Sequence, residues 1–392
     1  MLPLEGITVV SIEQAVAVPF ATRQLADLGA RVIKIERTGT GDFARHYDTS
    51  VNGMSSHFVW CNRSKESITL NLKDQETKKV VDKLLESADV FVQNLAPGAV
   101  ERMGYGADVL KEKYPELIIC NLSGYGETGP YKDKKAYDLL VQCEAGLVSV
   151  TGTEEVPSKA GISAADIAAG MYVYSGILTA LFTREKTGKG TVMEISMLEA
   201  LGEWMGYPAY YAGNSGKEPA RTGASHSTIY PYGPFSCGDG KTVFLGLQNE
   251  REWLRFCEVV LEQPELIDES AFKTNSLRDK NRDLLKSIIE TVFAGMTSSE
   301  VINRLEQAKI ASARLNTMQD FYRHPQLEAR ARWQEVGSPV GEIRALKPPV
   351  IMEGMNPVMK AIPSIGEHTE DILREYGFEE ETISKWVDAG VV

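Results

Sequence analysis

The chain has 392 residues, and 54 acidic residues outnumber 42 basic ones, which gives a formal net charge of −12. This acidic excess argues against nucleic acid as a partner, because phosphate binding needs a basic stripe that releases counterions. No apolar run reaches the roughly 20 residues that span a bilayer, and the N-terminus lacks the basic region of a secretory signal. The five cysteines are scattered, which favours a reducing compartment. We therefore expect a cytoplasmic enzyme with no membrane segment.

The first half of the chain alternates short β-branched runs with helical periodicity. Strands are predicted at 7–12, 31–35, 68–72, 89–92 and 117–122, and helices at 20–28 and 76–87. Strands separated by helices of this length are typical of βαβ units and a parallel sheet. The loops that follow the strands would then gather at one edge, where open α/β sheets bind ligands.

The second half has mixed content. Helices are predicted at 137–147 and 165–183, then a strand at 191–195 and a long helix from Met197. A hairpin at 230–236 and 242–247, followed by helices around Trp253, Leu284 and Val301, indicates a second, smaller domain over about 220–320. Strand-like pieces at 333–336 and 350–352 and a helix at 368–376 complete the chain.

Two familiar motifs are weak or absent. Gly124-Tyr-Gly126-Glu-Thr-Gly129 is a literal GxGxxG after an apolar strand, but Pro130 and a polar run follow it instead of a helix. A glycine-rich loop is therefore a better interpretation than a dinucleotide fingerprint. The five histidines are scattered and no HExxH, GxSxG or Walker pattern occurs, so we expect no metal site.

Asp166 is the only acid in the stretch of small apolar residues from Ala160 to Met171, at the start of a predicted helix. Ser163-x-x-Asp166 fits a capping box, so a purely structural role is one interpretation. The other is a carboxylate nucleophile, because its small neighbours leave room for approach and a helix N-terminus would keep it ionised.

Basic residues gather near the ends of the predicted strands. On the ligand-binding edge of an acidic protein, such a set suggests a phosphate-bearing ligand. Its members are Arg37, Arg45, Arg63, Lys65, Lys73, Arg102, Lys132, Lys134 and Lys135.

Together these residues resemble the class III CoA-transferase family of the CaiB/BaiF type, which includes formyl-CoA transferase. The resemblance covers essentially the whole chain. The matching motifs include Pro19-Phe-Ala-Thr, Leu25-Ala-Asp-Leu-Gly-Ala-Arg-Val-Ile-Lys-Ile-Glu36-Arg37, Asn62-Arg-Ser-Lys65, Asn94-Leu-Ala-Pro97-Gly98, Ser123-Gly-Tyr-Gly126, Asp166 with Gly170-Met171, and Gly366-Glu-His-Thr369.

The resemblance implies an α/β fold. A large Rossmann-like parallel-sheet domain would be built from both chain ends, residues 1–215 and 325–392, with a smaller α+β domain at 220–320. Two such chains would form an interlocked homodimer.

The resemblance also implies the chemistry. Asp166 would attack an acyl-CoA to give an aspartyl anhydride and then an aspartyl-CoA thioester, from which a carboxylic acid acceptor takes CoA. Acyl-CoA and coenzyme A are substrates, and no permanently bound cofactor is expected. By position, Arg37 would contact the adenine, Lys73, Asn94, Arg102 and Lys135 would line the CoA channel, and Tyr137 would lie on the substrate side.

The chain departs from formyl-CoA transferase at two places. Val16 replaces a glutamine that many members place three residues before Pro19, and the polyglycine loop gives way to a segment containing Gln248. Val16 and Gln248 are therefore candidate contacts for the substrate acid, and we expect an acid other than oxalate or formate.

The middle segment resembles relatives that act on short dicarboxylates, of the succinate, malate, citramalate, mesaconate, itaconate or glutarate type. A second carboxylate needs a cation, for which Arg45, Arg221 and His226 are candidates.

Three alternatives remain. An α-methylacyl-CoA racemase shares the fold but needs a histidine as its second base, and Tyr137 stands at that position. A dinucleotide-dependent oxidoreductase rests on the Gly124 motif alone. A non-catalytic CoA-binding protein would bind CoA and form no adduct.

Overall fold

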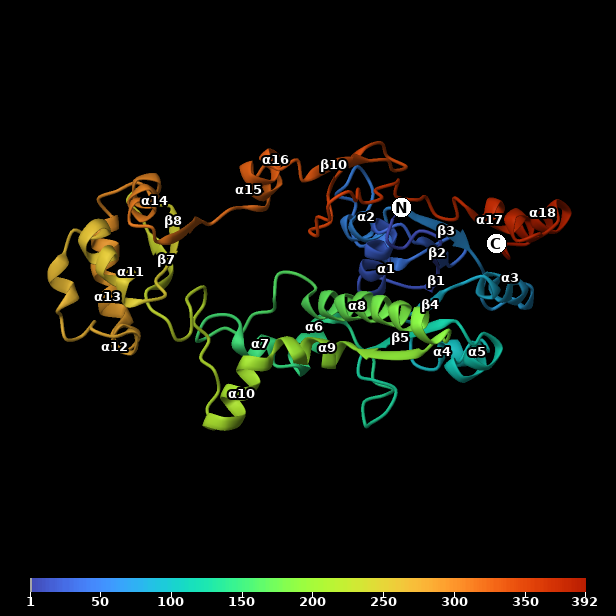
Figure 1. Cartoon of the computed structure of the whole chain (residues 1–392), viewed down its shortest axis with the longest axis horizontal. Coiled ribbons are helices and arrows are strands. Elements are labelled where there is room, and N and C mark those ends of the chain that lie inside the picture. Colours follow the sequence, from blue (N-terminus) through green and yellow to red (C-terminus); the bar gives the residue numbers. More distant parts are fainter. Residues whose placement is uncertain (1) are drawn as a thin grey trace. The chain divides into compact units, whose positions relative to one another are not determined.

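The first half of the chain forms a six-stranded parallel sheet in the computed structural model, which describes residues 2–392 (Figure 1). The strand order is β3-β2-β1-β4-β5-β6. It reverses between β1 and β4, so the loops after these two strands meet at the switch point where such sheets bind ligands. The strands are β1 (Thr8–Ile12), β2 (Arg31–Glu36), β3 (Lys65–Thr69), β4 (Val90–Gln93), β5 (Ile118–Ser123) and β6 (Val192–Ser196).

Successive residues of the strands enter two separate cores, because side chains in a strand alternate between faces. Val9 and Val32 belong to one core, whereas Val10 and Ile33 belong to the other. The helices that cover the first face include α1 (Ala17–Asp27), α8 (Ala164–Thr187) and α9 (Met197–Trp204). The second face is covered by α3 (Gln75–Glu86), α5 (Ala107–Lys113), α17 (Thr369–Glu375) and α18 (Glu380–Asp388).

The chain divides into two compact units. The chain up to Leu147, residues 160–206 and residues 327–392 form the unit that contains the parallel sheet. It also holds short elements, namely η1 (Phe43–His46), α2 (Ser56–Cys61), α4 (Ala99–Arg102), α6 (Asp138–Glu144), β10 (Trp333–Val336) and β11 (Ile343–Leu346). The helix α7 (Leu147–Val150) lies at the boundary, and α16 (Pro325–Ala329) begins just before the chain returns to this unit.

The second unit contains residues 148–159 and 207–326. The expected hairpin is present in it as β7 (Tyr232–Ser236) and β8 (Thr242–Gly246), and β9 (Ala311–Arg314) completes an antiparallel sheet. Its core includes Phe235, Trp253 and Phe293. Its helices are α10 (Gly206–Ser215), α11 (Glu250–Arg255), η2 (Phe256–Val260), η3 (Pro264–Ile267), α12 (Asn275–Lys280), α13 (Arg282–Phe293), α14 (Ser298–Gln307) and α15 (Met318–Tyr322).

Two predictions in the second half of the chain are wrong. Residues 350–352 form no strand, because they follow Pro348 and Pro349, which lack the N–H that a strand ladder needs. The strand that pairs with β10 is β11 instead. The helix predicted from Met197 is also shorter than expected, since α9 ends at Trp204 and α10 begins at Gly206.

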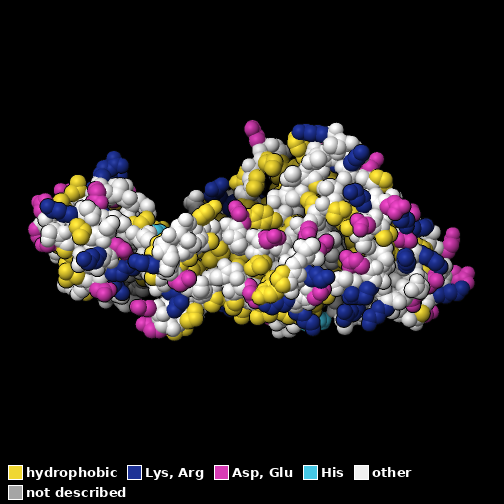
Figure 2. Space-filling model, turned by 90° about the horizontal axis from the view of Figure 1, so that it is seen from below, with side chains coloured by type: hydrophobic (Ala, Val, Ile, Leu, Met, Phe, Trp, Pro, Cys, Tyr) yellow, Lys and Arg dark blue, Asp and Glu magenta, His cyan; other side chains and the backbone are white. Residues whose placement is uncertain are grey.

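Helix α8 is long and apolar enough to cross a membrane by length and composition alone. This is weak support for a span, because the core helix of a soluble protein passes the same test. Ala168, Val173 and Ile177 of α8 are packed into the core against α1 and the sheet. Other apolar side chains of this unit are exposed, including Phe182 and Trp204. Figure 2 shows one face of the molecule, on which hydrophobic side chains lie among charged ones.

Candidate active site

Asp166 lies in the first turn of α8, and the N-terminus of this helix is capped from another helix. The Asp138 carboxylate, in the first turn of α6, accepts hydrogen bonds from the backbone N–H of Ala165 at 2.8 Å and of Asp166 at 3.4 Å. Ser163 makes no capping hydrogen bond through its side chain. The capping-box interpretation is therefore wrong, and the Asp166 carboxylate is not needed to cap the helix.

Burial, with a smaller contribution from the negative charge of Asp138, raises the pKa of Asp166 to about 7. The expectation that the helix N-terminus keeps this carboxylate fully ionised at neutral pH is therefore wrong. Desolvation and a neighbouring carboxylate both disfavour the charged form, and here they outweigh the helix dipole. A strongly raised pKa in a partly buried acid is typical of functional sites.

Helices α1 and α8 pack against each other in one core. Gly170 lies so close to α1 that an added Cβ would come within 2.5 Å of the Ala17 carbonyl oxygen. One turn further along α8, Tyr174 lies near Asp27 and Arg23 at the end of α1, and their charges act on its phenol. The turn of α8 that precedes Gly170 carries Asp166, so this carboxylate lies toward the loop that precedes α1.

Tyr47, which is not among the predicted site residues, lies close to this carboxylate. Burial, then the charges of Asp42 and Asp166, raise the pKa of the Tyr47 phenol to about 12. Its ring packs edge-on against His57, with 5.3 Å between ring centroids. Tyr47 therefore presents a neutral phenol near Asp166. No motif marks it, because it reaches the site only through the fold of the segment after β2.

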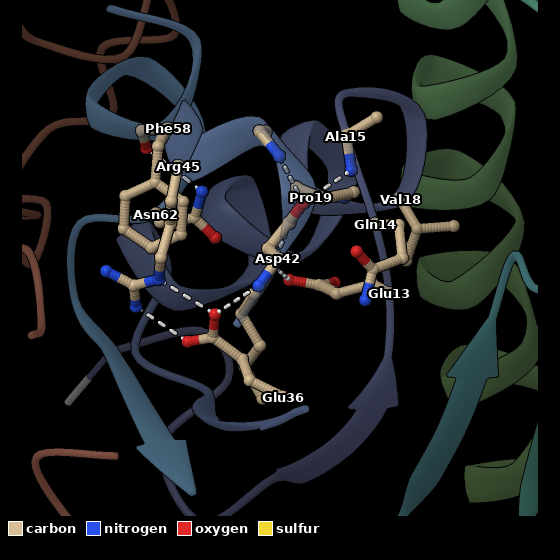
Figure 3. A network of polar contacts seen from close by, with 12 residues as sticks. Glu13, Gln14, Ala15, Val18, Pro19, Glu36, Asp42, Arg45, Phe58 and Asn62 are labelled. Carbon is tan, nitrogen blue, oxygen red and sulfur yellow. Dashed lines mark hydrogen bonds and ion pairs between the residues drawn. The ribbon is translucent and has the colours of Figure 1, made fainter. Parts of the chain in front are cut away.

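Several cations expected to meet a ligand are engaged in ion pairs inside the protein. The Arg45 guanidinium binds both oxygens of Glu36, at 2.6 and 2.8 Å (Figure 3). Arg63 binds Asp27 in the same two-pronged way, at 2.7 and 2.8 Å. Lys65 is buried and lies 2.6 Å from Glu13. The expectation that these three side chains face a phosphate-bearing ligand is wrong, since acids of β2, of α1 and of the loop after β1 hold them inside the protein.

Other members of the basic set are exposed at the carboxyl edge of the sheet. Arg37 follows β2, Lys73 follows β3, Arg102 ends α4, and Lys135 lies in the loop before α6. Tyr137 begins α6 and is 66% exposed. A cleft of about 280 Å³ opens at the ends of β4 and β5. Its lining includes Pro97, Gly98, Ser123, Gly126 and Lys132.

Asn94 and Val16 belong to the switch point. The Asn94 side chain accepts a hydrogen bond from the Gln14 N–H at 2.9 Å and donates one to the Gln14 carbonyl at 3.0 Å. Val16 is buried at the end of the same loop. Asn94 thus ties the loop after β1 to the end of β4.

The remaining candidates lie in the second unit. The Arg221 guanidinium donates to the carbonyls of Ser149, Thr153 and Glu154, at 3.1, 2.8 and 2.6 Å. His226 stacks on Tyr232, and its Nδ1 accepts hydrogen bonds from the N–H of Thr228 and of Ile229. Gln248 is exposed after β8. Of the three candidates for a second carboxylate, Arg45 and Arg221 are bonded within the protein, whereas the neutral His226 ring keeps its N–H at Nε2.

The glycine-rich segment after β5 is a loop. Between β5 and α6 the chain contains no helix within the described residues, so no helix N-terminus follows the Gly124 motif. Among residues 2–392 no group of three or more His, Cys, Asp or Glu side chains is arranged to hold a metal ion.

The model of the CoA-transferase family III matches residues 4–369 of this chain. The chain belongs to CoA-transferase family III. It is 35% identical over 402 residues to human succinyl-CoA:glutarate CoA-transferase, covering 100% of this chain and 90% of that protein. It is 31% identical over 407 residues to formyl-CoA:oxalate CoA-transferase of Shigella sonnei, covering 97% of each.

A solved structure of a CaiB/BaiF family protein from Brucella suis has the same fold as this CoA-transferase. Its TM-score is 0.85 at 30% identity, covering 96% of this chain and 99% of that one. The family predicted from the motifs is confirmed, and so is an α/β fold with a six-stranded parallel sheet and small antiparallel sheets. These findings do not favour the racemase or the dinucleotide oxidoreductase.

Proposed function

We propose that this family III CoA-transferase moves CoA from an acyl-CoA to a short dicarboxylic acid, with Asp166 as the covalent nucleophile. The observation that carries the proposal is the state of the Asp166 carboxylate. It is partly buried, and its pKa is raised by burial and by the neighbouring Asp138 charge. It does not cap α8, because Asp138 does so.

The first half of the reaction loads the enzyme. An Asp166 carboxylate oxygen attacks the thioester carbonyl carbon, the new C–O bond replaces the C–S bond, and CoA leaves as a thiolate. The thiolate then attacks the Asp166 carbonyl carbon of this anhydride, which releases the donor acid as a carboxylate and leaves an aspartyl-CoA thioester. The second half repeats these steps in reverse with the acceptor acid and regenerates the Asp166 carboxylate.

The surroundings of Asp166 favour these steps. Every covalent intermediate on Asp166 lacks the negative charge of the free carboxylate. Burial and the Asp138 charge, which raise the pKa of Asp166, destabilise that free carboxylate and so favour its acylation. Exchange between a thioester and an anhydride needs neither metal nor ATP, since the energies of the intermediates are comparable.

The choice of a dicarboxylic acid rests on the relatives and on one side chain. The human relative is named for succinyl-CoA and glutarate, and the Shigella sonnei relative for formyl-CoA and oxalate. The guanidinium groups of Arg45 and Arg221 are bonded within the protein. Of the candidates Arg45, Arg221 and His226, we therefore test His226 first as a determinant of the preference for dicarboxylic acids, since its Nε2 can donate a hydrogen bond.

His226→Ala should lower the preference for a dicarboxylic over a monocarboxylic acceptor about tenfold, because one hydrogen bond to a charged group is lost. The measurement is the ratio of kcat/KM for glutarate and butyrate with one acyl-CoA donor. Arg221→Ala serves as the comparison, and a larger loss of preference in that variant would move the assignment to Arg221.

The exposed cations at the carboxyl edge of the sheet are assigned to CoA, together with Asn94 and Tyr137. Lys73→Ala should raise the KM for acyl-CoA about tenfold and leave kcat within about twofold, because a remote phosphate contact contributes equally to ground and transition states. Lys111→Ala, an exposed lysine of α5, is the matched control. Equal KM values for the two variants would remove Lys73 from the CoA site.

A homodimer completes the proposal. Exposed apolar side chains on the first unit support it, including Leu139, Leu140, Phe182 and Trp204. Apolar surface of this kind marks association sites. Light scattering during size-exclusion chromatography measures the mass directly.

The scattered cysteines support a cytoplasmic location.

The decisive experiment is a panel of acyl-CoA donors against mono- and dicarboxylic acceptors, joined to adduct trapping. Incubation with acyl-CoA alone should load Asp166, and hydroxylamine or borohydride should then mark this residue in the mass spectrum. CoA binding without an adduct would identify a non-catalytic CoA-binding protein, and a reduced nicotinamide cofactor as product would identify an oxidoreductase.

A further inference from the structure

The loop between β1 and α1 is held from both sides at Gln14 and Ala15. On one side Asn94 makes its two hydrogen bonds to the Gln14 backbone. On the other side Asp42 Oδ1 accepts a hydrogen bond from the Ala15 N–H at 3.1 Å (Figure 3). The Gln14 side chain accepts a further bond from the Phe43 N–H at 3.2 Å. Four hydrogen bonds thus fix two consecutive residues.

Ala15 needs this restraint because its backbone is left-handed, with φ at 63°. In this region the Cβ of an L-residue crowds its own backbone, so residues other than glycine adopt it only when the surroundings hold them there. Released from its hydrogen bonds, the loop would relax toward a negative φ. That change would move Val16 and the first turn of α1.

Asp42 is itself fixed by a buried network of charges. Its Oδ2 lies 2.7 Å from Lys34 Nζ, and Lys34 lies 3.3 Å from Glu13, which also binds Lys65. None of these four side chains is more than 3% exposed. Apolar residues of similar volume often stabilise a fold as well as buried ion pairs do. What an apolar cluster lacks is an acceptor for the Ala15 N–H.

We propose that Asp42 is a positioning residue for the acceptor acid, holding the Gln14–Ala15 loop and thereby Val16 beside Asp166. The proposal rests on the proposed function, because it assumes that the acceptor is attacked at Asp166. Gly170, one turn after Asp166 on α8, packs against the Ala17 carbonyl at the start of α1, and the charges of Asp42 and Asp166 both act on Tyr47. A small acid has only the walls of its pocket for alignment, whereas an acyl-CoA is also anchored through CoA.

Asparagine cannot replace Asp42 in this role. Oδ1 accepts from the N–H groups of Ala15 and Ala44, while Oδ2 faces the Lys34 ammonium. An amide offers one accepting atom, so Asp42→Asn must turn an NH₂ group either toward the loop or toward Lys34. Either orientation loses one of the two contacts.

The test compares Asp42→Asn with Asp27→Asn. Asp27 is equally buried and binds Arg23 and Arg63, but it lies at the other end of α1. Asp42→Asn should lower kcat/KM for the acceptor about 100-fold, while loading of Asp166 from acyl-CoA alone stays within about threefold. Asp27→Asn should leave the ratio of acceptor turnover to loading unchanged, whatever it does to the melting temperature.

A second variant decides the matter if Asp42→Asn does not fold. Ala15→Val strains the loop without touching the charges, because a branched Cβ is least compatible with a left-handed backbone. It should show the same defect, confined to the acceptor. Equal acceptor-to-loading ratios in Asp42→Asn and Asp27→Asn, or an unaffected Ala15→Val, would overturn the positioning role. Absence of any adduct in the unmodified enzyme would instead overturn the proposed function.

Discussion

Asp166→Asn should lower CoA transfer by about 10,000-fold or more, because the variant keeps the shape of the side chain and loses the nucleophile. The amide has no oxygen able to form the anhydride, so neither half of the reaction can start. Initial rates with saturating donor and acceptor measure the loss. Mass spectrometry should show no adduct at position 166.

The same variant also has a stability signature that separates chemistry from unfolding. The folded protein raises the pKa of Asp166 to about 7, so it binds this proton more tightly than the unfolded chain does. The stability that this proton contributes is present at low pH and is lost as pH rises from the ordinary aspartate range through about 7. Asp166→Asn should therefore melt at a higher temperature than the unmodified enzyme above about pH 8 and at a similar one only below about pH 4. Full activity, or a lower melting temperature at pH 8, would contradict the assignment.

The strands could be predicted from the sequence, and Asp166 could be proposed as the nucleophile, because both are local signals. Runs such as Arg31–Glu36 combine β-branched residues with turn residues at their ends, and Asp166 is conspicuous among small apolar neighbours. The wrong site predictions share one cause. Arg45 and Lys65 are normal basic residues in the sequence, and their roles depend on which acid the fold places opposite them.

The raised pKa of Asp166 could not be predicted from the sequence for the same reason. Asp138 lies 28 residues earlier and reaches the α8 N-terminus only after α6 and α8 pack together. A capping motif read from Ser163 and Asp166 alone assigns the cap to the wrong side chain. The position of Tyr47 and the hydrogen bond from Ala15 to Asp42 likewise arise because the loops after β1 and β2 meet at one edge of the sheet.

Asp138→Asn should shift the pH dependence of the reaction toward acid. Transfer needs the Asp166 carboxylate, so kcat/KM for acyl-CoA should fall below about pH 7, by about tenfold for each further pH unit. Removing the Asp138 charge removes one cause of the raised pKa, while an asparagine oxygen can still cap the Ala165 N–H. Because burial is the larger cause, the acidic limb should move down yet stay above the ordinary aspartate range.

The measurement is kcat/KM from about pH 5 to about pH 9, with the Asp166 adduct as a second readout. Asp108→Asn, in the first turn of α5 on the other face of the sheet, is the matched control and should leave the limb in place. The rate at which Asp138→Asn loads Asp166, divided by the rate of the unmodified enzyme, should be larger at pH 6 than at pH 8. An unshifted limb would mean that Asp138 acts on Asp166 only as a helix cap, and burial alone would then account for the raised pKa.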